Sequence, residues 1–194
     1  MQTSAWDRNT RLFHWGLAVT ISFELISGLY VSAPDTRLYF HLHEACGLVA
    51  AAVIALHWMW SFANRDLSIL FPWNAEGFAR ARAELVGALW GRLPAQGRRA
   101  GLSSLVHGLG LLAATGMALT GVFIFMVIPG GQGASAASTD YAMFTSLALL
   151  HKSLSHFVWA YLGGHLAFAI FHQFRGHSVF GAIFIGSTDA KSAE

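Results

Sequence analysis

The sequence predicts an all-α integral membrane protein, a bundle of four transmembrane helices with both termini in the cytoplasm. Two observations predict this class. Of the 194 residues, 55% are hydrophobic and only 11% are charged, whereas soluble domains carry roughly a quarter charged residues. The charges are also clustered, and they leave four apolar stretches of about 20 residues or more, the length that crosses a bilayer.

The four stretches define the predicted spans, which are Leu12–Val31, His43–Phe62, Leu102–Ile128 and Leu147–Phe174. The first is not read as a signal peptide, because it contains Glu24 and because Pro34 directly follows the one small-residue site, Val31-Ser32-Ala33. We therefore expect a retained first span and a single transmembrane domain over residues 1–194.

The connections between the spans differ in length. Ser32–Leu42 and Pro129–Met143 are short, and the second contains a Gly/Ala/Ser-rich stretch at residues 130–138. The connection over residues 63–101 is long and contains a segment, Glu76–Arg92, with apolar residues at helical spacing. This segment is predicted to be a helix in the headgroup plane, a docking surface for a cytoplasmic partner, or a surface helix that covers the bundle.

The basic residues predict the orientation. Ten of the twelve lie at the termini or in the 63–101 connection, and Arg37 and Lys152 lie on the opposite side. The positive-inside rule then puts both termini in the cytoplasm. The positive charge is explained by this topology and by anionic lipid headgroups, so we expect no nucleic-acid partner. The ten residues are Arg8, Arg11, Arg65, Arg80, Arg82, Arg92, Arg98, Arg99, Arg175 and Lys191.

The histidines predict the chemistry. The chain has ten, and several fall inside the spans, where ionisable groups are costly and face the bundle interior. His151 and His165 are 14 residues apart, which places them within about 40° on one helix face and about 21 Å apart along the axis. Two imidazoles at two depths would hold two stacked haems. Since Cys46 is the only cysteine, neither haem could be attached through two thioether links, and an intrachain disulfide or a cysteine-ligated iron–sulfur cluster is excluded.

Each haem needs a second axial ligand of matching depth. His43 begins the second span level with His151, on the outer side, and His14 lies roughly level with His165, on the inner side. His57 is a rival to His14, because it follows His43 by the same 14 residues. Spacing alone leaves the choice between His14 and His57 open. Iron with two imidazole ligands favours electron transfer over oxygen binding.

Several motifs resemble those of the bacterial cytochrome b561 family, which includes the cytochrome b subunits of nickel–iron hydrogenases. Arg11-Leu12-Phe13-His14-Trp15 is similar to the family's Arg-x-x-His-Trp opening, and His43-Glu44-Ala45-Cys46-Gly47 to its His-x-x-x-Gly motif in span two. Leu105-Val106-His107-Gly108 and Thr120-Gly121 follow in span three, so the resemblance covers about Trp6 to Arg175. It implies haem ligands in spans one, two and four, which are His14, His43, His151 and His165.

The resemblance thus favours His14 over His57 for the inner haem. Relatives commonly have an arginine late in span two, where this chain has His57. We expect His57, His107 and Arg175 to contact a haem propionate or a quinone. Glu24, deep in span one, is a candidate for quinone-coupled proton transfer or for a structural hydrogen bond. Gly47 and Gly121 are the glycines best placed to make room for haem.

The functional prediction is a diheme b-type cytochrome that transfers electrons between a quinone pool, ubiquinone or menaquinone, and a redox partner. Its place would be a respiratory chain in the bacterial inner membrane. The redox partner could be periplasmic or cytoplasmic, and a homodimer is among the assemblies that stay open. The choice between a stand-alone quinone-linked oxidoreductase and the membrane anchor of a larger one, such as a hydrogenase, also stays open. The alternative of another class is a histidine-lined metal or proton transport protein.

Overall fold

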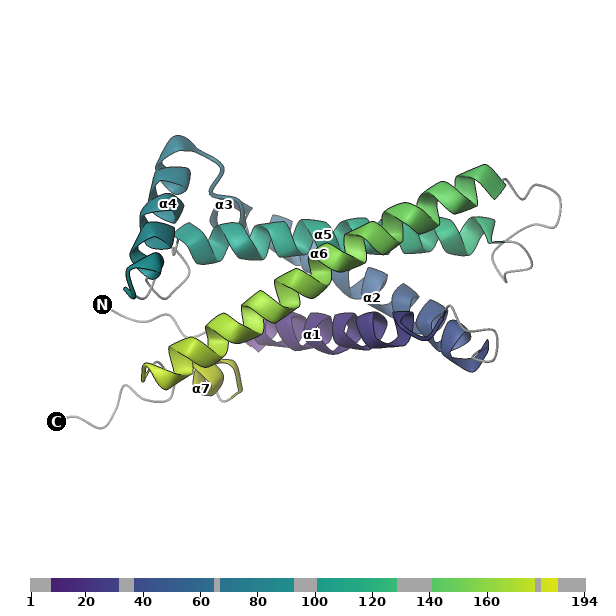
Figure 1. The fold of residues 1–194 in the computed structure, drawn as a ribbon, viewed down its shortest axis with the longest axis horizontal. Helices are drawn as coiled ribbons and strands as arrows, with labels where there is room; N and C mark the ends of the chain where they lie inside the picture. The colour runs from purple at the N-terminus through teal and green to yellow at the C-terminus, as the bar shows by residue number, and fades with distance from the viewer. Residues whose placement is uncertain are drawn as a thin grey trace. The chain divides into compact units, whose positions relative to one another are not determined.

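The computed structural model describes residues 8–31, 37–64, 67–92, 101–128, 141–176 and 179–184. Within these ranges the chain is helical, with no strand. Figure 1 shows the helices in chain order. They are α1 (Arg8–Gly28), α2 (Arg37–Ala63), α3 (Leu67–Leu70), α4 (Ala75–Leu89), α5 (Gly101–Val127), α6 (Tyr141–Phe174) and α7 (Val179–Phe184).

Three of the described helices are long and apolar enough to cross a membrane: Leu38–Ala63 of α2, α5 and α6. They agree with the second, third and fourth predicted spans. α1 has 21 residues, enough for about 32 Å of helix, but it contains Arg8, Arg11 and Glu24 and is not among the three. That α1 crosses the membrane stays a prediction, as do the four-helix bundle and the cytoplasmic location of both termini.

Two helices begin six residues before the predicted spans. α2 begins at Arg37, not His43, and α6 begins at Tyr141, not Leu147. The physical reason is that apolar runs mark only the hydrocarbon-crossing part of a helix, whereas its backbone hydrogen bonds continue into the headgroup region. The predicted inner helix Glu76–Arg92 is present as α4, with slightly earlier ends. The glycine-rich stretch 130–138 and the basic residues Arg65, Arg98, Arg99 and Lys191 lie outside the described residues.

The chain divides into two compact units, which we describe separately. The first, here called the long-helix unit, comprises His14–Trp58 and Leu111–Leu162. In it α1 and α2 pack antiparallel, since Gly16 lies against Val53 near one end and Gly28 lies against His43 near the other. α5 and α6 also pack antiparallel, with Gly116 against Leu154 and Gly121 against His151. Glycine at these contacts lets helices approach closely, as is common in membranes.

The second unit, here called the terminal unit, comprises Met1–Phe13, Met59–Gly110 and Gly163–Glu194. Within it α4 lies across the beginning of α5 (Figure 1). α4 begins after Asn74, whose side chain accepts a hydrogen bond from the Gly77 amide at 2.7 Å. The Glu84 carboxylate of α4 accepts from the amides of Gly101 and Leu102 at 3.1 and 2.7 Å. These two amides are among the four that an α-helix leaves unpaired at its start, so Glu84 caps α5.

Candidate functional site

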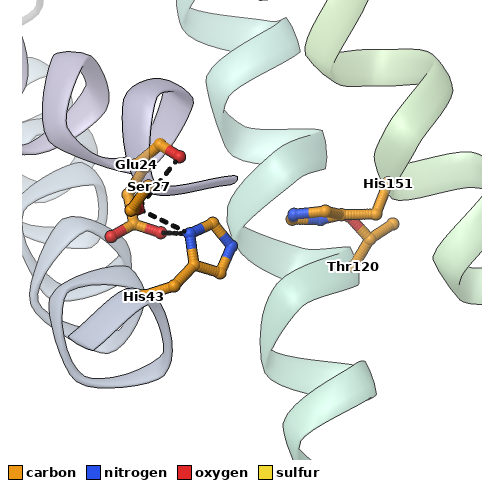
Figure 2. A network of polar contacts seen from close by, with 5 residues as sticks. All are labelled: Glu24, Ser27, His43, Thr120 and His151. Atoms are coloured by element: carbon orange, nitrogen blue, oxygen red, sulfur yellow. Dashed lines mark hydrogen bonds and ion pairs between the residues drawn. The ribbon is translucent and has the colours of Figure 1, made fainter. Parts of the chain in front are cut away.

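Two of the predicted ligands come together in the long-helix unit. The ring centroids of His43, from α2, and His151, from α6, are 6.3 Å apart and the ring planes are perpendicular. Figure 2 shows the two rings pointing toward one another. Imidazole nitrogens bind first-row metals at about 2 Å, so two rings on opposite sides of one ion have centres about 6 Å apart. The observed spacing therefore fits one iron between the two imidazoles.

The Nδ1 atom of His151 is engaged by α5. It lies 2.9 Å from the Thr120 hydroxyl oxygen, and the Thr120 hydroxyl itself lies 2.8 Å from the Gly116 carbonyl oxygen of the same helix. Because the single hydroxyl hydrogen is donated to that carbonyl, Thr120 accepts from Nδ1–H of His151. The hydrogen is then on Nδ1, and the Nε2 atom of His151 keeps its lone pair for a metal.

The Nδ1 atom of His43 is engaged by α1. It lies 3.0 Å from Glu24 Oε2 and 2.9 Å from the Ser27 hydroxyl oxygen, as the dashed lines in Figure 2 show. A carboxylate has no hydrogen to give, so Nδ1 of His43 carries the hydrogen and donates it. In the neutral imidazole its Nε2 atom thus also keeps a lone pair. Histidines that bind metals commonly donate the other ring N–H in this way, which fixes the tautomer and the ring orientation.

Two glycines give these side chains their room. A Cβ atom at Gly47 would lie 3.2 Å from Glu24 Oε2, and one at Gly121 would lie 3.3 Å from Cε1 of His151. Both distances are shorter than ordinary van der Waals contact between such atoms. Of the two glycines singled out in the sequence, Gly121 thus adjoins His151, whereas Gly47 adjoins the Glu24 carboxylate that contacts His43. The residues present therefore fit a haem whose iron lies between His43 and His151.

A second histidine pair lies in the terminal unit. The ring centroids of His107, on α5, and His165, on α6, are 5.2 Å apart with an interplanar angle of 89°. Nδ1 of His107 donates to the Ser103 carbonyl oxygen of its own helix at 2.7 Å. This spacing is about 1 Å shorter than an ion between two imidazoles needs, so the pair as it stands is a contact between neighbours.

The remaining predicted residues are distributed over both units. His14 and His57 belong to the long-helix unit and His165 to the terminal unit, so either pairing for the inner haem stays a prediction. The His14 ring lies edge-on to Trp15, with centroids 5.7 Å apart. Arg175, just beyond α6 in the terminal unit, lies with its guanidinium carbon 5.1 Å from the centre of the Phe171 ring.

Ser27 and Thr120 were missed as functional residues by the sequence reasoning. Thr120 belongs to the Thr120-Gly121 motif, which by itself indicates no role for its hydroxyl. For Ser27 no signal was available, because a single small polar residue in a span is common and its partner lies 16 residues away on another helix. Glu24 was singled out, and the structure pairs it with His43.

The comparisons with known proteins identify the family of this chain. A family model described as prokaryotic cytochrome b561 matches residues 5–186, nearly the whole chain. No curated protein and no solved structure matches. This family is membrane-bound and implies haem b. The chain therefore belongs to the prokaryotic cytochrome b561 family and is a membrane b-type cytochrome of electron transfer.

Proposed function

We propose that this cytochrome carries two b haems and transfers electrons between a quinone pool and a redox partner, in the bacterial inner membrane. The single observation that supports it most is the His43–His151 pair, whose rings are 6.3 Å apart and whose Nδ1 atoms both have hydrogen-bond partners. Haem b, when bound, would supply a one-electron couple, which suits electron transfer.

The residues around the outer haem have distinct tasks in this proposal. His43 and His151 would hold the iron through Nε2, and Glu24, Ser27 and Thr120 orient the two rings through Nδ1. Each ring is thus held from a helix other than its own, which limits its rotation and keeps the two Nε2 atoms opposed.

From the family resemblance, His14 and His165 would hold the inner haem. His57, His107 and Arg175 would then contact a propionate or a quinone. The contact between His107 and His165 supports a role for His107 beside this haem, because an imidazole there could hydrogen-bond a quinone oxygen. The guanidinium of Arg175 suits a carboxylate, which it can bind with two parallel hydrogen bonds.

Two kinds of redox partner fit this cytochrome. The chain either exchanges electrons with a small periplasmic or cytoplasmic redox protein, or anchors a larger oxidoreductase such as a hydrogenase. Which proteins copurify from native membrane decides between these, and the same purification gives the oligomeric state, a homodimer included.

The test of the proposal is spectroscopic. The chain is purified from membranes in mild detergent, and its visible spectrum is recorded before and after reduction by dithionite and by a quinol. We expect a b-type α-band, about two haems per chain in the pyridine haemochrome assay, and reduction by the quinol. A colourless protein that is folded by circular dichroism would overturn the proposal.

A further inference from the structure

The two rings of the outer site are held by groups of different charge. His151 Nδ1 donates to a neutral hydroxyl, that of Thr120, whereas His43 Nδ1 donates to the carboxylate of Glu24 at 3.0 Å. The side chains of Glu24 and His43 are 13% and 20% exposed, so little solvent is available to screen the interaction.

Glu24 lies on the side of α1 that packs against α2, where it contacts His43 and lies near Gly47. Its Oε1 atom is buried and has no hydrogen-bond partner among the described residues. Burial of a carboxylate is expensive unless it is paired. Its described partner is the Nδ1–H of His43, and Gly47 provides the space that this contact needs.

We propose that Glu24 is a positioning residue that holds the reduction potential of the outer haem low. Its carboxylate fixes the His43 ring and, by attracting the Nδ1 hydrogen, makes Nε2 a more electron-rich ligand. Electron donation by the ligand and the nearby negative charge both favour ferric iron, which carries one more positive charge than ferrous iron. This inference rests on the proposed function, since it needs a haem on His43.

The experiment is a redox titration of the full-length protein at one pH, comparing the wild type with Glu24→Gln. The outer haem is the component that is lost in His43→Ala. Glutamine keeps the size of the side chain and removes its charge. We expect the equilibrium constant for reduction of the outer haem to rise about tenfold, which for a one-electron couple is a potential about 59 mV higher. The other haem should keep its potential.

Glu44→Gln is the matched control. Glu44 follows His43 in the sequence, and its carboxylate contacts His41 at 3.3 Å. The variant removes the same charge close to the site without touching the His43 ring. We expect less than half of the Glu24→Gln effect. An equal effect would contradict a role through the ring.

The outcomes separate the inference from the proposed function. If Glu24→Gln retains both haems with unchanged potentials, the inference is wrong and the proposed function stands. If His43→Ala loses no haem, the proposed ligand assignment itself fails. If Glu24→Gln loses the outer haem, its potential cannot be measured in that variant. Glu24→Asp is then compared with the wild type, because aspartate keeps the charge. Retention of haem near the wild-type potential in Glu24→Asp supports the inference, and loss of haem from that folded variant overturns it.

Discussion

The two histidine pairs of this chain look alike until their surroundings are compared. His43 and His151 in the long-helix unit, and His107 and His165 in the terminal unit, each bring two nearly perpendicular rings together. The centroids are 6.3 Å apart in the first pair and 5.2 Å apart in the second. Only the first spacing leaves room for a metal ion between the rings.

The anchoring of Nδ1 differs as well. In the first pair the anchors are side chains of other helices, Glu24 and Ser27 on α1 and Thr120 on α5. In the second pair Nδ1 of His107 is bound by a carbonyl of its own helix, which is an ordinary way to satisfy a histidine in a span. Proximity of two imidazoles is thus a weak sign of a haem site, and cross-helix anchors at the right spacing are a stronger one.

The largest expected effect comes from the first pair. His43→Ala and His151→Ala should each lower the haem content from about two per chain to about one, because one imidazole holds haem b poorly. The measurement is the pyridine haemochrome assay on purified protein. His156→Ala is the control, since His156 is exposed on the same helix and its Nδ1 binds the Lys152 carbonyl oxygen. A similar loss of haem in His156→Ala would show that the assay reports general damage to α6.

The second pair gives the next prediction. His165→Ala should lose the inner haem, and so should His14→Ala, whereas His57→Ala and His107→Ala should retain both haems. Haem content and the amplitudes of the two redox components provide the measurement. Loss of the inner haem in His57→Ala, with retention in His14→Ala, would assign His57 as the ligand. Loss in His107→Ala would mean that the 5.2 Å contact opens to admit iron.

A smaller effect is expected at the anchors. Thr120→Val keeps the shape of the side chain and removes the side-chain acceptor of His151 Nδ1–H, so we expect haem affinity to fall about tenfold, as is typical when such a partner is removed. Competition of the outer haem with an apo-protein acceptor measures the change. Thr145→Val is the control, because the Thr145 hydroxyl is exposed and donates to the Tyr141 carbonyl oxygen of its own helix. Equal affinities in the two variants would refute an anchoring role for Thr120.

The sequence predicted those features that depend on the residues of a single helix. Apolar runs predicted α2, α5 and α6, and the depth of His43 and His151 in their spans predicted that these two would meet. The starts of the helices were less predictable, because Tyr39 and Tyr141 lie in helical segments that precede the predicted spans.

The partners of the two rings could not be predicted. The contact of Ser27 with His43, and that of Thr120 with His151, each join different helices. These contacts depend on how each helix is rotated about its own axis. Because the spans are apolar on all sides, the periodicity of apolar residues does not indicate which face of a helix meets its neighbour. Glu24 was noticeable because a carboxylate in a span is rare, yet nothing in the sequence connected it to His43.

The two facing rings come from distant parts of the chain, and this distance affects how the protein assembles. His43 and His151 are separated by more than a hundred residues, with all of α5 in between. Iron bound by both imidazoles would join these distant segments as a crosslink does, and it would offset the entropy lost in closing so long a loop. A ligand that binds only the folded chain also stabilises it by mass action. Haem would then be part of the folding of this chain in the membrane, and the supply of haem would set how much folded protein a cell accumulates.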